Sequence, residues 1–127
     1  MKLIIGGAFQ GKGDYAKETY GGTVYDCRLP ENKDKLDLDL SADIIDGLEA
    51  FTRLYAEEQL EAADWLRAHE AQLVDKVIGC DDISQGLVPM DPVDRAWREM
   101  NGRALLYLAG IAESVERVFC GIPQRLK

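Results

Sequence analysis

The sequence predicts an α/β protein with three layers and a mainly parallel central sheet of about five strands. Short apolar runs that suit buried strands alternate along the chain with segments whose apolar residues have helical spacing. The first of these runs, Leu3–Ile5, leads directly into a glycine-rich loop and then into a helix. At 127 residues the chain is long enough for one core and too short for two, so residues 1–127 are expected to form a single domain.

The first half of the chain supplies two strands and one helix. After the strand at Leu3–Ile5, a helix is expected from Gly11 to about Thr19. Gly21 and Gly22 then break the chain before a second short strand at Thr23–Cys27. Residues 30–39 are charged and irregular. They end in the alternating run Leu36–Leu40, which is predicted to be a mobile loop or a peripheral strand.

The second half continues the alternation. Residues Ser41–Gly47 are interpreted as a third strand, although a helix beginning at Ser41 is an alternative. Helical spacing then extends from Leu48 to about Leu73. The remaining predicted elements are a strand at Val74–Cys80, a helix from about Val93 to Ser114, and a last strand at Val115–Cys120 that Gly121 and Pro123 end.

The glycine-rich loop after the first strand has the spacing of a phosphate-binding P-loop. Gly6-x-x-x-x-Gly11-Lys12 follows an apolar strand and precedes a helix, which is the context that this motif requires. Glycines let successive backbone N–H groups face one anion, and the lysine adds positive charge. The next position normally carries a Ser or Thr hydroxyl for Mg²⁺, and here it is Gly13. The motif places a nucleotide on Gly6, Gly7, Ala8, Gly11, Lys12 and Gly13, with Lys12 as a catalytic residue.

Two other interpretations of this loop stay open. It is a glycine-rich turn that binds nothing, or it is a dinucleotide site. Gly11-x-Gly13-x-x-Ala16 fits the dinucleotide fingerprint, and Asp26 lies near the end of the second strand, where a ribose-binding acid belongs. The fingerprint begins too late, however, because five residues separate it from the end of the first strand.

Acidic residues follow two of the predicted strands. Asp81 and Asp82 come directly after an apolar strand, at the sheet edge where α/β proteins bind ligands. An acid at this edge of a P-loop enzyme holds Mg²⁺ directly or through water, so we predict Asp81 and Asp82 as metal ligands and Asp82 as a catalytic residue. Asp46 ends another apolar run and is a weaker candidate. A polar strand end or a helix cap is the alternative for each of them.

Composition excludes several classes of partner. The net charge of −8, from 23 acidic and 15 basic residues, argues against a nucleic-acid or anionic-membrane partner, because both need a basic face. No apolar stretch approaches the roughly 18 residues that span a bilayer. The three cysteines lack C-x-x-C spacing, which favours reduced thiols in a cytoplasmic protein.

Both ends of the chain resemble the adenosylcobinamide kinase / adenosylcobinamide-phosphate guanylyltransferase family of cobalamin biosynthesis. The loop Ile4-Ile5-Gly6-Gly7-Ala8-x-x-Gly11-Lys12 is similar to that family's G-G-A-R-S-G-K-S loop. Three C-terminal segments follow the family's G-I-V-P, R-x-F-R-D-x-x-G-R and S-G-I-P-x-x-L-K motifs in order: Gly86-Leu87-Val88-Pro89, Arg95-x-Trp97-Arg98-Glu99-x-x-Gly102-Arg103 and Cys120-Gly121-Ile122-Pro123-x-x-Leu126-Lys127. The middle of the chain aligns only loosely.

The resemblance implies a P-loop NTPase-like fold that binds ATP or GTP with Mg²⁺ and transfers a phosphoryl or nucleotidyl group to a corrinoid. It places Gly6, Gly11 and Lys12 on the phosphates and Asp46 near the nucleotide, and it aligns Asp81 and Asp82 with the family's Asn-Glu pair. It also implies a homo-oligomer.

The departures from this family concern its chemistry. The family carries a histidine after the second strand that takes the GMP group covalently, whereas residues 28–40 are shortened here and contain no histidine. The single histidine, His69, lies elsewhere in the sequence, so guanylyl transfer is not expected. Leu105-Leu106 also replaces the family's Asn-Gln. The leading hypothesis is a transferase of the cobinamide kinase type. The alternatives are a non-catalytic nucleotide-binding relative and a structural protein with a vestigial loop.

Overall fold

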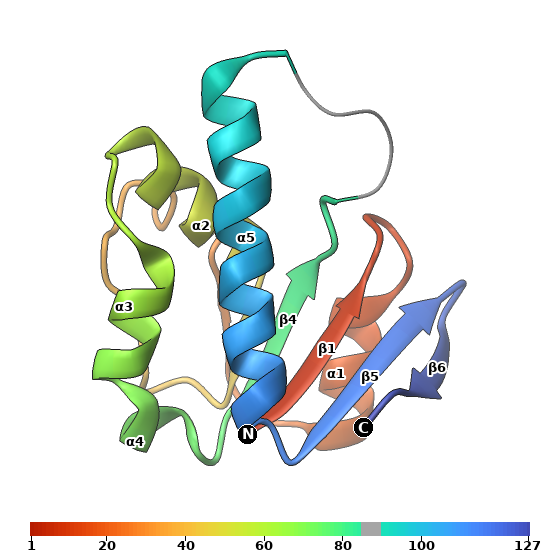
Figure 1. The fold of residues 1–127 in the computed structure, drawn as a ribbon. Helices are drawn as coiled ribbons and strands as arrows, with labels where there is room; N and C mark the ends of the chain where they lie inside the picture. Colours follow the sequence, from red (N-terminus) through yellow and green to blue (C-terminus); the bar gives the residue numbers. More distant parts are fainter. Residues whose placement is uncertain (85–89) are drawn as a thin grey trace.

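A mostly parallel sheet forms the middle layer of the protein (Figure 1). The computed structural model describes residues 1–84 and 90–127, and in that part of the chain the sheet has six strands in the order β2-β3-β4-β1-β5-β6. The strands are β1 (Lys2–Gly6), β2 (Val24–Asp26), β3 (Ile44–Asp46), β4 (Val77–Asp81), β5 (Ser114–Phe119) and β6 (Ile122–Arg125). The first five are parallel to one another, and β6 is antiparallel to β5. The predicted α/β class is confirmed.

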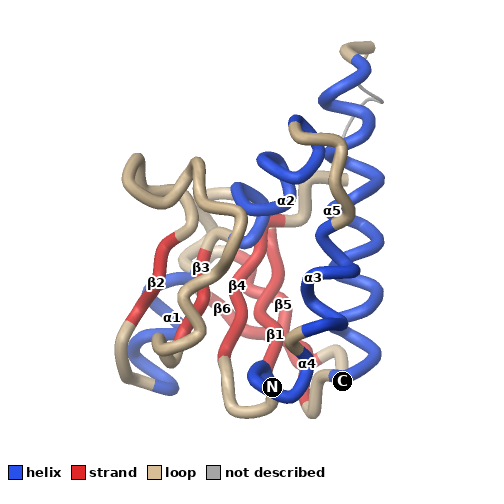
Figure 2. The backbone as a smooth tube through the Cα atoms, turned by 90° about the vertical axis from the view of Figure 1, so that its left-hand side faces the viewer, coloured by secondary structure: helices blue, strands red, loops and turns tan. Residues whose placement is uncertain are grey.

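Helices cover both faces of this sheet. They are α1 (Lys12–Tyr20), α2 (Leu48–Glu57), α3 (Ala62–Ala68), α4 (Glu70–Leu73) and α5 (Pro92–Ile111). Figure 2 shows α1 on one side of the strands and α3 and α5 on the other. Alternate side chains of each strand point to opposite faces, so β1 packs Ile4 toward α1 and Leu3 toward the α2–α5 layer. The result is the three-layer arrangement that the alternating pattern predicts.

The long helical segment expected from Leu48 to Leu73 is interrupted. Helix α2 ends at Glu57, and Gln59 adopts a positive φ of 57° that no helix accommodates. The Glu61 side chain then accepts a hydrogen bond from the Ala63 N–H at 3.4 Å and caps the start of α3. The apolar spacing continues through the break because both helices pack on the same face of the sheet. The spacing of apolar residues alone therefore could not locate the break between α2 and α3.

The structure decides between the two alternatives for Leu36–Leu40 and corrects the expected end of the sheet. The run Leu36–Leu40 is a loop and forms no strand. Instead its backbone packs over the helical layer, where Leu38 is buried and the Tyr55 hydroxyl donates to the Leu36 carbonyl at 2.6 Å. Cys120 and Gly121 both have positive φ, the geometry of a tight hairpin turn, so the chain reverses into β6 instead of ending its strands at Gly121. Pro123 is tolerated because β6 is an edge strand.

The connections of the strands diverge at one end of the sheet, between β1 and β4. From β1 the chain passes through α1 to β2 at the far edge, whereas β4 leads to α5 on the opposite face and then to β5. Such crossovers are almost always right-handed, so connections that run in opposite directions lie on opposite faces. The chain therefore leaves the carboxyl ends of neighbouring β1 and β4 toward different faces. Open α/β sheets bind their ligands in the crevice that this divergence produces.

Asp43 joins the beginnings of β2 and β3. Its Oδ2 accepts hydrogen bonds from the Thr23 backbone N–H at 2.9 Å and from the Thr23 hydroxyl at 3.2 Å. These bonds, the backbone one first, hold the pKa of Asp43 below its usual value of 3.8. The charged carboxylate therefore stabilises the fold above that pH, and this contribution is lost as the pH falls through the lowered pKa.

Replacing Asp43 with asparagine is expected to lower the melting temperature slightly at neutral pH. The difference from the native protein should shrink as the pH falls from 3.8 through the lowered pKa, because both side chains are neutral below that pKa. Thermal unfolding followed by circular dichroism across this pH range measures the effect. A difference that stays constant with pH would show that the charge of Asp43 does not contribute.

Candidate functional site

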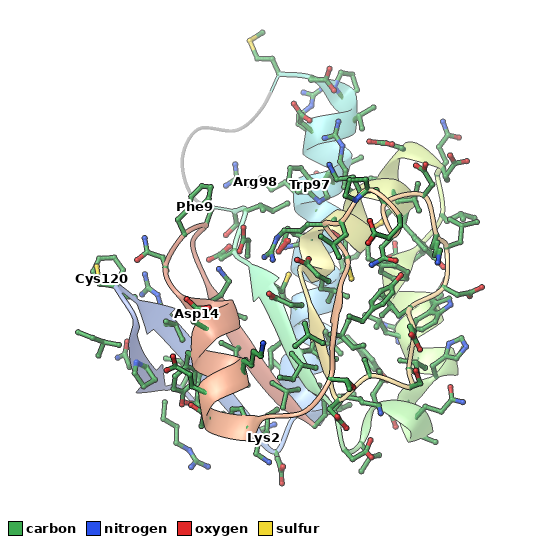
Figure 3. The ribbon with its side chains drawn as sticks, turned by 180° about the vertical axis from the view of Figure 1, so that it is seen from behind. Lys2, Phe9, Asp14, Trp97, Arg98 and Cys120 are labelled. Carbon is green, nitrogen blue, oxygen red and sulfur yellow. The ribbon has the colours of Figure 1, made fainter. Side chains whose placement is uncertain are left out.

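The glycine-rich loop joins β1 to α1 where the motif predicts it. Gly11 precedes the first residue of α1 with φ of 88°, a left-handed conformation that favours glycine. A Cβ atom at Gly6 would lie 2.5 Å from the carbonyl oxygen of Val118 on the neighbouring part of the sheet, so no larger residue fits there. Figure 3 shows Phe9 at the tip of the loop, where its side chain is fully exposed. The two glycines therefore fix the path of the loop between β1 and α1.

Lys12 folds back from the start of α1 into the edge of the sheet. Only 5% of its surface is exposed. Its Nζ donates to the Gly7 carbonyl at 2.6 Å and lies 2.5 Å from Asp81 Oδ1 at the end of β4. The backbone N–H groups of the first turn of α1 have no acceptor within the helix. The ammonium of Lys12 and the first backbone N–H groups of α1 thus lie at the same end of the loop.

The β5–β6 hairpin holds the loop from the other side. The Cys120 N–H donates to Gln10 Oε1 and the Gly121 N–H donates to the Gln10 carbonyl, both at 2.8 Å. Figure 3 shows Cys120 at the end of the hairpin, on the side where Phe9 marks the loop. Residues more than a hundred positions apart in sequence therefore position the loop together.

Arg28, just after β2, is the centre of an ion-pair cluster at the carboxyl edge of the sheet. Its Nε and Nη2 donate to the two carboxylate oxygens of Glu49 at 3.1 and 3.0 Å. Nη2 also donates to Asp81 Oδ1 at 3.3 Å, and Nη1 donates to Asp46 Oδ2 at 3.3 Å. Burial alone would lower the pKa of Arg28, but these carboxylates raise it overall. The side chain is a permanent cation.

Glu49, in the first turn of α2, supports both Arg28 and Asp81. Its Oε1 also accepts the backbone N–H of Asp81 at 2.9 Å, which fixes the end of β4. Burial is the main cause that raises the pKa of Glu49, and the nearby Asp81 charge adds to it, while the bonds from Asp81 N–H and Arg28 oppose the shift. Asn101 on α5 completes the support, since its side-chain amide donates to the Asp81 carbonyl at 3.2 Å.

Asp46 lies in close contact with the loop. Its Oδ1 accepts the Gly47 N–H at 2.8 Å. A Cβ atom at Gly13 would lie 2.9 Å from Asp46 Oδ2, and one at Gly79 would lie 2.6 Å from Asp46 Oδ1. The carboxylate therefore fits between two positions that carry no side chain.

Two pockets meet at this cluster. One of 580 Å³ is lined by the loop, by the start of α1 and by three charged side chains: residues 8–14, Arg28, Asp46 and Asp81. The other, of 500 Å³, lies toward α2 and α5, and Leu54, Arg53 and Trp97 contribute to its walls. Arg28 and Asp81 line both pockets. We name these the loop pocket and the helix pocket.

The predicted site residues divide between two places. The loop pocket brings together Ala8, Gly11, Lys12, Gly13, Asp46 and Asp81. Gly6, Gly7 and Asp82 line a separate pocket with Arg117 and Phe119. The Asp82 backbone N–H donates to the Gly6 carbonyl at 2.7 Å, and its carboxylate accepts from the Ser84 N–H and hydroxyl. The catalytic and metal roles of Asp82 stay predictions, without a place in the loop pocket.

Mg²⁺, which the loop motif implies, does not fit the side chains of the loop pocket. Gly13 offers no hydroxyl, and the Asp46 and Asp81 carboxylates already contact Arg28, with Lys12 also on Asp81. Among the residues that the structure describes, no group of three or more His, Cys, Asp or Glu side chains is arranged to hold a metal ion. The metal roles of Asp81 and Asp82 therefore stay predictions that this geometry does not favour.

Sequence reasoning missed Arg28, Glu49 and Asn101. A usable signal existed for Asn101, because a buried asparagine among apolar helix positions implies a specific hydrogen-bond partner. Arg28 follows a strand end, which also places it at the ligand-binding edge. Glu49 had no such signal, since an acid in the first turn of a helix is usually a solvated charge near the helix dipole.

The C-terminal motifs that carry the family resemblance are only partly visible. Gly86–Pro89 lie outside the described residues. Trp97 donates from Nε1 to the Glu49 carbonyl at 2.8 Å, and Arg98 donates to the Ser84 carbonyl at 2.6 Å. Arg103 pairs with Glu61, away from the site. His69 stacks on Trp65 and lines neither pocket.

Comparison with protein-family models finds no match to this chain, and comparison with curated proteins finds no significant match either. In the described part of the chain, no helix is long and apolar enough to cross a membrane.

Proposed function

We propose that this protein binds the phosphates of a nucleoside triphosphate, ATP or GTP, in the loop pocket. The observation that carries the proposal is the position of Lys12. A lysine at the start of a helix, with glycines before and after it, lines a 580 Å³ pocket near the carboxyl ends of β1 and β4. Phosphates are the ligands that a helix N-terminus and a glycine-rich loop bind best.

In the structure Lys12 contacts protein groups, and a bound phosphate would replace them as its partners. Its Nζ contacts the Gly7 carbonyl and Asp81 Oδ1. A phosphate oxygen in the pocket offers a stronger, charge-assisted acceptor than the carbonyl. Asp81 keeps its contact with Arg28 when Lys12 turns away. Binding therefore exchanges one set of partners for another and leaves no buried charge alone.

The proposed reaction is phosphoryl transfer to an alcohol, with Lys12 as the catalytic residue. Such transfer depends on positioning and on charge neutralisation rather than on a protein nucleophile. The helix pocket adjoins the loop pocket, and the apolar faces of Trp97 and Leu54 in its walls suit the acceptor. The sequence resemblance makes a corrinoid alcohol of the adenosylcobinamide type the candidate acceptor. A histidine-linked guanylyl intermediate is not proposed, because His69 lines neither pocket.

A second candidate function is nucleotide binding without turnover. The absence of a hydroxyl at Gly13 and the engagement of Asp46 and Asp81 by protein cations both favour it. These features remove the ligands that a kinase of this motif uses for its metal. In this case the protein would have a regulatory role, in which its nucleotide-bound and nucleotide-free states differ.

Calorimetric titration with ATP and with GTP tests the shared part of both candidates. Saturable binding of one nucleotide at a single site is the expected result, and no binding of either would contradict both. Incubation with the bound nucleotide and adenosylcobinamide then separates them. Formation of the phosphorylated corrinoid supports the kinase, and binding without product supports the second candidate.

A further inference from the structure

We propose that Arg28 is a built-in cation that takes the place of a protein-held Mg²⁺ beside the bound phosphates. Nucleotide binding then needs no divalent metal. This inference rests on the proposed binding of a nucleoside triphosphate in the loop pocket. It goes further by naming the group that supplies the second positive charge.

The position of Arg28 is the first support. It lines the same pocket as residues 8–14, which is the space assigned to the phosphates. It contacts Asp46 and Asp81, the two carboxylates at the ends of β3 and β4. In a P-loop enzyme an acid at this edge of the sheet serves the metal, and the metal bridges it to the phosphates. In this protein Arg28, instead of a metal, contacts the two carboxylates.

Counting donors shows what is left for a ligand. A guanidinium has five N–H donors in a fixed plane. Four are used in the hydrogen bonds to Glu49, Asp46 and Asp81. The fifth is on Nη1, and the nearest ion-pair partner of that atom beyond Asp46 is Asp26 Oδ1 at 3.8 Å, which is too far for a hydrogen bond. Among the described residues nothing accepts this donor, and the side chain is 38% exposed.

Two glycines make the arrangement possible. At Gly13, a Cβ atom would lie 2.9 Å from Asp46 Oδ2, so the missing side chain leaves the space that the carboxylate uses. At Gly47, a Cβ atom would lie 2.7 Å from Arg28 Cγ, and φ is 71°. The bare Gly47 therefore lets the stem of Arg28 cross the start of α2. The missing side chains at Gly13 and Gly47 thus leave room for both members of the Asp46–Arg28 ion pair.

The conformation of Arg28 is also fixed before any ligand arrives. Its backbone N–H donates to Asp26 Oδ1 at 2.9 Å. The bidentate pairing with Glu49, which is buried, holds the plane of the guanidinium. Arginine suits such a role better than lysine because its planar fork binds a carboxylate and a phosphate in defined directions. We expect little rearrangement of Arg28 on binding.

Titration of the native protein with ATP and GTP, once in Mg²⁺ and once in excess EDTA, is the test. The expected result is a Kd in EDTA within about 3-fold of that in Mg²⁺. Arg28→Gln should weaken binding in EDTA by about 10-fold or more, with part of the loss recovered in Mg²⁺. Arg28→Lys keeps the charge but not the planar guanidinium, so its Kd in EDTA should lie between those of the native protein and Arg28→Gln. Arg103→Gln, which breaks a surface ion pair with Glu61, is the matched control.

The outcomes separate the two proposals. No nucleotide binding under either condition would contradict the proposed function itself. Native binding that weakens by about 10-fold or more in EDTA would overturn the role of Arg28 and leave nucleotide binding intact. This comparison needs only the native chain, so it stands even if Arg28→Gln fails to fold. Equal weakening by Arg28→Gln and Arg103→Gln would also overturn the proposal.

Discussion

Nucleotide binding is expected to weaken by about 100-fold or more when Lys12 is replaced with methionine. A hydrogen bond between a lysine and a phosphate is charge-assisted, and its loss costs about 3 kcal/mol. Methionine is an unbranched side chain of similar volume, so it keeps the packing of the buried stem. Calorimetric titration with the nucleotide that binds the native protein measures the effect.

This substitution also has a cost in stability. Lys12 is buried against Asp81, and removing one partner of a buried ion pair leaves the other uncompensated. Arg28 still contacts Asp81, so we expect a loss of about 2 kcal/mol, less than for an isolated buried pair. Lys17→Met, on the exposed side of the same helix, is the matched control and should leave both properties unchanged. A Lys12→Met protein that is folded and binds within about 3-fold of native would refute the assignment.

Asn101→Ala is expected to lower the free energy of unfolding by about 3 kcal/mol. Asn101 is 1% exposed, and its amide donates to the Asp81 carbonyl while its carbonyl oxygen accepts from the Thr52 hydroxyl at 2.7 Å. Alanine leaves the Asp81 carbonyl without this donor and opens a cavity between α5 and the sheet. Urea unfolding followed by fluorescence gives the free energy of unfolding directly.

The same change should also weaken nucleotide binding, because Asn101 fixes the end of β4 from which Asp81 reaches Lys12 and Arg28. We expect a loss of several-fold, smaller than that of Lys12→Met. Glu99→Ala, on the exposed side of α5, is the control and should change stability by less than about 0.5 kcal/mol. If the free energy of unfolding of Asn101→Ala lies within about 0.5 kcal/mol of the native value, the hydrogen bonds of Asn101 to Thr52 and Asp81 contribute little to stability.

The sequence predicts the parts of the fold that depend on local pattern. Alternating apolar strands and helices give the α/β class, and the spacing from Gly6 to Lys12 locates the loop between β1 and α1. Strand β3 is confirmed at Ile44–Asp46, against the alternative helix. The predictions that were wrong concern features that depend on contacts between distant parts of the chain. Strand β6 needs β5 as its partner, and the break after α2 needs the packing of α2 and α3 on one face.

The candidate site shows the same division. Lys12, Gly13 and Asp46 were identified because each follows a strand or belongs to a motif. Arg28 and Glu49 were not identified. Arg28 also follows a strand end, but an arginine and a glutamate twenty-one positions apart form no sequence pattern that indicates a bidentate pair. Tertiary structure brings them together at the ends of β2 and β3, which neighbour each other in the sheet. Asp82 was placed correctly at a strand end, but its side chain faces a different pocket from Asp81.

The hairpin between β5 and β6 gives this molecule a natural reporter position. Cys120 at its tip is exposed, whereas Cys27 and Cys80 are buried, and burial raises the pKa of both buried thiols. A maleimide dye at neutral pH should therefore attach at one place, next to the Gln10 backbone and side chain. Fluorescence from that dye would follow the loop as its ligand arrives, without any engineered cysteine.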